Sequence, residues 1–347
     1  MKLFATTLLC SSALLGFSET FETKAVEGEV LVRTFAFSSE SSLESSSMLM
    51  DGEEVPGHGG EMEQESSFST EYVVRDTHLE VADGQVASVE RTYEQLEQNI
   101  TEHMQPPMGE EAFDSEFSSE SDLTDKSVVL TIEDDEVSAA WADGHEGDEG
   151  LLADLEICED FGVLLPESAM ELQGTWSLPP SLLEKLSAPL GDLHMEAEEG
   201  PDDMGDEGPE MPDEEFEGDI QATFAEIVEE DGRRLARVEF TVDVSSTVDM
   251  TEFVLAMTAS ENPDDMPEGA MVPDIKSMEH ESTYVGSGTF LWDLKAGRLA
   301  SFDLTCEITR AETVTMEIAM GAESVEIEQI SEYAGTDTWS MRFESGQ

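Results

Sequence analysis

The stretch GRLASFDLT, residues 297–305, alternates apolar and polar side chains directly after a glycine. Two other stretches share this form: GQVASVERT at residues 84–92, and GRRLARVEFT at residues 232–241, which carries one extra residue. The glycine supplies the backbone freedom that a tight turn needs, and alternation buries one set of side chains while the other meets water. Each stretch therefore predicts the second strand of a β-hairpin.

The residues before each glycine also alternate, in THLEVADG (77–84), ATFAEIVEEDG (222–232) and GTFLWDLKAG (288–297). Asp-Gly and Ala-Gly at the junctions are turn signals. A form that recurs three times is explained by folding alone, whereas a catalytic site is usually built once. We interpret all three stretches as scaffold.

The rest of the chain adds strands and little helix. Further strands are predicted at residues 29–37, 70–75, 128–132, 313–320 and 325–343. Leu151, Leu155 and Cys158 share one helical face, which predicts a helix near 150–161, and SLLEKL (181–186) predicts a shorter one. The expected fold is mainly β with minor α: a curved antiparallel sheet or half-barrel of repeated hairpins with one or two short helices.

An acidic segment, EAEEGPDDMGDEGPEMPDEEFE (196–217), contains no Lys or Arg and is too polar to bury a core. It suggests an N-terminal β-rich half (19–190), an acidic Met/Gly/Pro loop (191–217) and a C-terminal β-rich half (218–347). Two domains or one continuous sheet with a long loop would both give this pattern. Polar loops or hairpin tips are also predicted at 38–47, 50–67 and 109–125.

Residues 1–18, MKLFATTLLCSSALLGFS, have the pattern of a secretory signal peptide: Lys2, an apolar run, then small residues before a cleavage position. We expect an exported protein, periplasmic or extracellular. No later segment has the roughly 18 uncharged apolar residues of a membrane span, so an integral membrane protein is not expected.

The chain is strongly acidic, with 82 Asp and Glu against 15 Lys and Arg and a formal net charge of −67. Nucleic acid is an unsuitable partner, because phosphate backbones are bound by clustered basic residues. Repulsion among the carboxylates must be offset by spacing or by cations from a salty medium. No particular protein partner is indicated.

Two cysteines follow the signal segment, Cys158 and Cys306. An oxidising compartment would permit a disulfide between them. Cys306, however, alternates in phase with Phe302 and Leu304, which equally fits a buried free thiol. The sequence leaves both alternatives open.

Signatures of catalysis are missing. Ser287, in YVGSGTF, lacks the outer glycines of a nucleophile elbow, and His280-Glu281 has no second His four residues later. GSGTFL fits neither phosphate-binding loop pattern. Carboxylates are too numerous to single out a general acid or base. We therefore assign no catalytic residue and no cofactor, and expect a protein that is not an enzyme.

Methionine and histidine occur close together in three places, the first of which is HGGEM with His58 and Met62. Thioether and imidazole are ligands that copper prefers. An exported copper or divalent-cation protein is therefore the alternative function, and 18 Met in an acidic chain would also place some near His by chance. The candidate metal ligands are His103, Met104, Met108, His194, Met195, Met204 and Met211.

Four tryptophans, Trp141, Trp176, Trp292 and Trp339, could line an apolar pocket, although most tryptophans in β-rich proteins belong to the core.

The segments FGVLLPESAMELQGTWSLP (161–179) and GSGTFLWDLKAGRLASFDLT (286–305) resemble uncharacterised exported bacterial β-rich proteins whose hairpins look like a lipoprotein-carrier half-barrel. The resemblance implies a curved sheet around a helical plug, with an apolar hollow for acyl chains. It carries over no binding residue, because the matching positions are turns and strand cores. The acidic excess and the 196–217 segment depart from the carrier pattern. We therefore expect an exported, non-enzymatic protein that binds an apolar ligand or lipid on a concave sheet.

Overall fold

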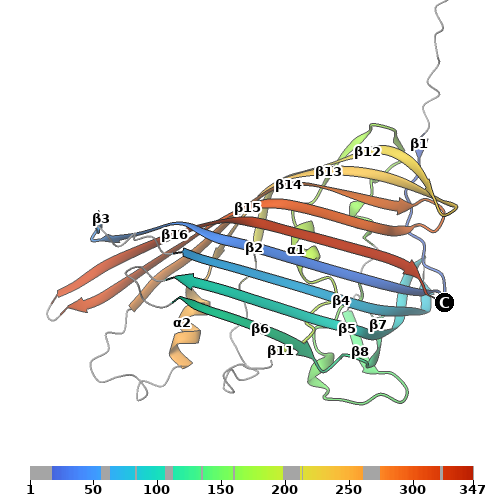
Figure 1. Ribbon diagram of the computed structural model, residues 1–347. Coiled ribbons are helices and arrows are strands. Elements are labelled where there is room, and N and C mark those ends of the chain that lie inside the picture. Colours follow the sequence, from blue (N-terminus) through green and yellow to red (C-terminus); the bar gives the residue numbers. More distant parts are fainter. Residues whose placement is uncertain are drawn as a thin grey trace, which may run out of the picture.

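One bent antiparallel sheet of 14 strands dominates the computed structural model (Figure 1). The structure describes residues 18–55, 63–82, 84–105, 112–133, 136–158, 161–197, 212, 214–260, 274–320 and 323–346. The expected signal peptide, residues 1–18, lies outside this part of the chain except for Ser18. Among the described ranges, no helix has the length and apolar content to cross a membrane.

Eleven strands follow one another across the sheet in the order β10-β12-β13-β14-β15-β16-β2-β4-β5-β6-β11. In that order they are Thr175–Leu178, Glu215–Glu230, Arg233–Asp249, Asp274–Asp293, Arg298–Met320, Glu323–Ser345, Val30–Met50, Glu63–Ala82, Gln85–Gln105, Phe113–Ser121 and Met195–Ala197. Off this path, β3 (Glu53–Glu54) pairs with β2, and β7 (Ser127–Glu133) pairs with β5 and β8 (Glu136–Trp141). A separate small pair joins β1 (Ser18–Glu19) to β9 (Met170–Glu171).

The three predicted hairpins are confirmed, and all lie in the same sheet. They are β4–β5, β12–β13 and β14–β15. Gly84, Gly232 and Gly297 have φ of 85°, 77° and 68°, the left-handed region that favours glycine. The prediction of a mainly β fold with a curved antiparallel sheet and little helix is therefore correct.

Strict alternation gives the sheet two different faces. In β13 the side chains of Val238, Phe240, Val242 and Val244 are buried and those between them are exposed. We call the buried side the inner face and the other the outer face. Residues 142–194, the covering segment, pack their apolar side chains against part of the inner face; Figure 1 shows them with α1 (Leu182–Ser187) behind one half of the sheet.

The short helix predicted at 181–186 is confirmed as α1, but the helix predicted near 150–161 is wrong. The structure has two single 3-10 turns instead, Gly150–Leu152 and Gly162–Leu164. Backbone groups between them bond outside the segment: Leu155 forms a β-bridge with Gly191, and the carbonyls of Glu156 and Cys158 accept from arginines of the sheet. These partners replace the hydrogen bonds of a helix.

A second helix that the sequence did not predict, α2 (Thr251–Ser260), follows β13 directly. The Asp249 carboxylate accepts a hydrogen bond from the Thr251 backbone N–H at 2.9 Å, and the Thr251 hydroxyl accepts one from the Met278 N–H of β14 at 2.9 Å. These bonds attach the start of α2 to the sheet.

The polar loops predicted at 38–47, 50–67 and 109–125 are largely wrong. Residues 38–47 are the second part of β2, 63–67 begin β4, and 113–121 are β6. These Ser- and Glu-rich parts lie beyond the covering segment, so neither face needs a regular apolar pattern. Cross-strand backbone hydrogen bonds to β16 and β5 hold them extended.

The two predicted halves share the one sheet, because β16 pairs with β2 from residues 327–345 against 50–31. The acidic segment begins within β11 and ends within β12. Its residues 198–211 and 213 lie outside the described part.

A buried charge cluster joins β2, β4 and β5 to the covering segment. Arg91 Nε donates to Asp76 Oδ1 at 2.8 Å, and Arg33 Nε lies 3.5 Å from Asp76 Oδ2. All three side chains are at most 2% exposed. Arg91 Nη1 donates to the Glu156 carbonyl at 2.8 Å, and Arg33 Nη1 to the Cys158 carbonyl at 3.0 Å.

Burial alone would raise the pKa of Asp76, but the attraction of Arg91 and Arg33 outweighs it and holds that pKa below its usual range. Asp76 is therefore ionised throughout the neutral range, and the cluster carries charges of both signs.

Replacing Asp76 by Asn leaves two buried guanidinium groups without their counter-charge, so we expect Asp76→Asn to lower the free energy of unfolding by about 3–5 kcal/mol. Because the folded-state pKa of Asp76 is depressed, its contribution is present above the unfolded pKa near 4 and is lost as pH falls through the folded value. Urea titrations of both proteins between pH 7 and about 3 should show the difference shrinking with acidity. In the control, Asp303→Asn, the exposed Asp303–Arg342 pair (2.8 Å) is broken at a cost below about 1 kcal/mol.

The second glycine of GSGTFL, Gly288, makes room for a core ring. Gly288 of β14 lies opposite Phe240, and a Cβ at this position would overlap the Phe240 ring and the Asp303 carbonyl. Phe240 stacks on Phe302 with ring centroids 5.3 Å apart. Gly288 is therefore a packing residue.

We expect Gly288→Ala to destabilise the fold by about 1–3 kcal/mol, because the added methyl group overpacks a filled site. Ser287→Ala, whose side chain is exposed on the outer face, should change stability by less than about 0.5 kcal/mol. Equal midpoints for the two variants in thermal unfolding would contradict this assignment.

Candidate functional site

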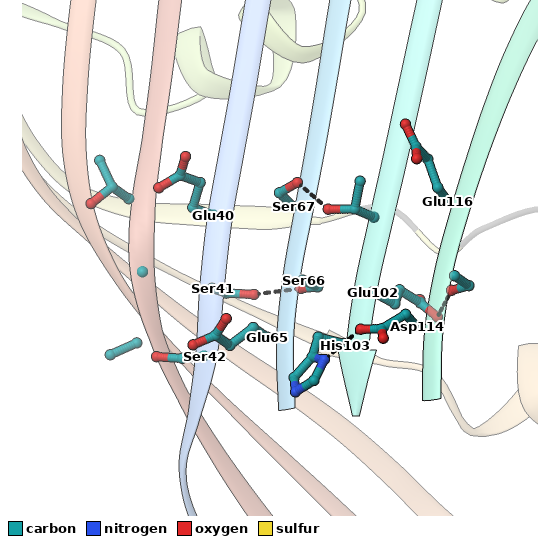
Figure 2. A pocket seen from close by; sticks show the side chains of 15 residues that line it. Glu40, Ser41, Ser42, Glu65, Ser66, Ser67, Glu102, His103, Asp114 and Glu116 are labelled. Atoms are coloured by element: carbon teal, nitrogen blue, oxygen red, sulfur yellow. Dashed lines mark hydrogen bonds and ion pairs between the residues drawn. The ribbon is translucent and has the colours of Figure 1, made fainter. Parts of the chain in front are cut away.

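Two hollows are the candidate sites. The first, the polar pocket, has a volume of about 800 Å³ and lies over β16, β2, β4, β5 and β6 beyond the covering segment (Figure 2). It is lined by Glu40, Ser41, Ser42, Glu65, Ser66, Ser67, Thr101, Glu102, His103, Asp114, Ser115, Glu116, Ala334, Gly335 and Thr336.

Strand register arranges the polar pocket in rows. Glu40, Ser67, Thr101 and Glu116 lie side by side in one row on the outer face. Two residues further along the strands, Ser42, Glu65, His103 and Asp114 form a second outer-face row. Since alternate residues point to opposite faces, the row between them, with Ser41, Ser66, Glu102 and Ser115, belongs to the inner face.

His103 and Asp114 form a close polar contact in this pocket, with Nδ1 and Oδ1 2.6 Å apart (Figure 2). The hydrogen bond to Asp114 raises the pKa of His103 above its usual value. Ser67 and Thr101 hydrogen-bond to each other at 2.6 Å rather than to the imidazole. The pair is therefore a His–carboxylate contact without a nucleophile hydroxyl attached to it.

The carboxylates of the polar pocket are largely exposed, and within the described ranges no three His, Cys, Asp or Glu side chains are grouped closely enough to hold a metal ion. Such a surface attracts cations from the medium through its summed charge.

The predicted metal ligands fall in separate places. His103 points to the outer face and Met104 to the inner face, because they are neighbours on one strand. His194 lies next to β11, and β11 meets β6 seven residues from Asp114, about 24 Å along the strand. His103 and His194 thus do not meet. Met195 packs against the core, and Met108, Met204 and Met211 lie outside the described residues.

The second hollow, the apolar pocket, has a volume of about 840 Å³ and lies between the β7–β8 hairpin and residues 152–163 of the covering segment. Ile132 and Val137, on the two strands of the hairpin, are each 40% exposed. The lining consists of Val86, Ile132, Val137, Leu152, Leu155, Ile157, Cys158, Gly162 and Val163, with Thr23, Gln85, Asp154 and Glu156 as its polar members.

The buried charge cluster fixes one wall of the apolar pocket. Arg91 and Arg33 bind the carbonyls of Glu156 and Cys158, so the backbone between Leu155 and Cys158 is held against the sheet from behind. The side chains of Ile132 and Val137, on the β7–β8 hairpin, contribute to the opposing surface. The pocket is thus built on anchored backbone.

Cys158 and Cys306 are both buried and form no disulfide with each other, which decides between the two alternatives. Cys306 lies in the middle of β15 and Cys158 in the wall of the apolar pocket. Burial raises the pKa of the Cys306 thiol to about 12 and raises that of Cys158 as well. Neither thiol is activated as a nucleophile.

None of the four tryptophans lines the polar pocket or the apolar pocket. Trp292 and Trp339 are core residues, 0% and 3% exposed, and Trp176 contacts Phe21 and donates to the Leu164 carbonyl at 3.0 Å. Trp141 is half-buried at the end of β8, with the Lys126 ammonium 5.4 Å from its ring centroid.

No protein-family model and no curated protein matches the chain. Among solved structures, the transport unit of the autotransporter AIDA-I from Escherichia coli matches with 8% identity over 92% of this chain and 91% of that chain, at a TM-score of 0.26. An outer membrane channel from Pseudomonas putida F1 matches with 7% identity over 92% of this chain and 97% of that one, at a TM-score of 0.22. Scores this low do not define a shared fold, so we draw nothing further from either.

The thiol assignment gives a direct test. When the protein without residues 1–18 is unfolded in denaturant, two thiols should react with a thiol reagent, whether or not reductant is present, because no disulfide is formed. The native protein should react far more slowly with a thiol reagent, since both sulfurs are buried and their pKa values are raised. Two thiols appearing only after reduction would contradict the structure.

Proposed function

We propose that this chain is an exported, non-enzymatic binding protein that holds an apolar ligand in the apolar pocket, on the inner side of its bent sheet. The observation that carries the proposal is the pocket itself: about 840 Å³, with seven aliphatic residues among the thirteen that line it and with Ile132 and Val137 left 40% exposed. Ligand sites have this size and combine apolar side chains with a small number of polar groups.

The charges around the pocket indicate the class of ligand. Asp154 and Glu156 are exposed at its margin, and the whole chain carries a net charge of −67. An anionic headgroup would be repelled at every stage of approach. The ligand is therefore an uncharged apolar molecule or an amphiphile with a neutral head.

A binding role without catalysis is supported by the state of the reactive groups. The thiol in the apolar pocket, Cys158, is buried with a raised pKa, and the His103–Asp114 pair lies on the outer face without an attached hydroxyl. Export rests on the signal pattern of residues 1–18. The alternative, a copper or divalent-cation protein that uses the seven predicted ligands, gains no specific observation from the geometry.

The test uses the protein without residues 1–18 and the neutral dye Nile red, followed by fluorescence. We expect saturable binding at one site and competition by a long-chain alcohol. Val137→Glu should weaken dye binding by roughly tenfold or more, because it places a charge in the apolar lining.

Val285→Glu is the matched control, since Val285 is 50% exposed on the outer face of β14, away from the pocket. It should leave dye binding unchanged, and circular dichroism should confirm that both variants are folded. Equal effects of the two substitutions, or no saturable binding by the parent protein, would overturn the proposal. Native mass spectrometry of the purified protein would identify a ligand that co-purifies.

A further inference from the structure

Methionine and histidine side chains meet at the end of β13, next to α2. The backbone N–H of Met250, the first residue after β13, donates to the Met278 carbonyl of β14 at 2.8 Å. This bond continues the pairing of Val248 with His280, so Met250 lies directly opposite Met278. His280 is two residues from Met278 on the same strand. Met250, Met278 and His280 therefore occupy neighbouring positions.

These three side chains are on the inner face of the sheet. Met250 continues the alternation of β13 that includes the buried Val244. Met278 and His280 are in phase with the buried Tyr284 of β14. Residues directly opposite, or two apart on one strand, have Cβ atoms about 5–7 Å from each other. Methionine and histidine side chains at such positions can reach a common point above the strands.

A third methionine adjoins this group from β15. Met316 alternates in phase with the buried Ile308, so it is also on the inner face. The direct partner of Met278 on β15 is Val314, and Met316 is two residues further along, at a diagonal distance of about 7–8 Å. All four side chains are partly buried. We call Met250, Met278, His280 and Met316 the methionine cluster; none of them is among the ligands predicted from the sequence.

The chemistry of the methionine cluster favours Cu(I). Thioether sulfur is a soft ligand that selects Cu(I), and neutral imidazole binds copper as well. Burial, and next to it the charge of Arg310, lower the pKa of His280, so this imidazole is neutral at pH 7. Glu312 and Glu214 act on the imidazole in the opposite direction, and their charges would attract a cation bound beside it. Hard cations such as Ca²⁺ prefer oxygen ligands, which the cluster itself does not offer.

We propose that the methionine cluster is a binding site for a single Cu(I) ion. The ligands would be the sulfurs of Met250 and Met278 and one imidazole nitrogen of His280, with the sulfur of Met316 as a fourth. The ion is bound without a change of oxidation state. The proposal is independent of the apolar pocket and would give the chain a second binding role.

The test uses the full chain without residues 1–18, kept anaerobic with ascorbate, and Cu(I) supplied as its coloured complex with bicinchoninate. We expect the protein to remove one equivalent of Cu(I) from this complex. Met278→Leu keeps the side-chain volume but lacks the thioether, so it should weaken Cu(I) binding by roughly tenfold or more. Circular dichroism should confirm that the variant is folded.

Met50→Leu is the matched control, because Met50 is 39% exposed on β2, which β15 and β16 separate from β14. It should leave the affinity for Cu(I) unchanged. Equal affinities of the two variants, or no transfer of Cu(I) to the parent protein, would overturn the proposal.

A second measurement follows the ligands directly. In protein labelled with ¹³C at the methionine methyl groups, one equivalent of Ag(I), a redox-inert substitute for Cu(I), should shift the methyl signals of Met250, Met278 and Met316. The signal of Met50 should stay in place, and each signal can be assigned from the corresponding Met→Leu variant. Unchanged signals of Met250 and Met278 would show that the metal binds elsewhere and would also overturn the proposal.

Discussion

The ionic contact of Asp76 with Arg91 and Arg33 is the constraint on which the rest of the structure depends. Its three side chains, each at most 2% exposed, connect the strands β4, β5 and β2. The same arginines hold the covering segment by its carbonyls. Without this contact the two arginines would no longer be held in place to bind the carbonyls of Glu156 and Cys158, and one wall of the apolar pocket would lose these two hydrogen bonds. A buried ion pair gives little net stability relative to an apolar core, but it fixes one arrangement of the parts around it.

The strands β2 and β4 each have two parts with different surroundings. One part packs under the covering segment with an alternating apolar pattern, and the other extends beyond it with Ser, Thr and acidic side chains (Figure 1). The first part provides the core and the apolar pocket. The second provides the polar pocket. The two pockets therefore belong to different environments of one sheet.

The hairpins and the fold class could be predicted from the sequence because alternation and turn glycines are local signals. The far strand segments could not, because a run such as SSESSLESSS (residues 38–47) has no apolar phase and is extended only by its neighbours in the sheet. The two arginines of the charge cluster could have been recognised from their positions in the alternating pattern, although the overall composition does not point to them. Arg33 lies in phase with Leu31 and Phe35, and Arg91 with Val89 and Tyr93, so each arginine occupies a buried position of an apolar strand. The apolar pocket had no sequence signal, since it depends on how residues 152–163 fold back as turns rather than as a helix.

The pairing of β2 with β16 has a consequence for how the chain is made. These strands lie next to each other at the centre of the sheet, yet their paired residues are roughly 300 positions apart, from the first and the last long strands of the chain. A ribosome must finish the protein before this seam can close. Until then the two flanks have no common partner, and repulsion among their carboxylates opposes contact between them. The centre of the sheet is thus the seam whose contacts are the most distant along the chain.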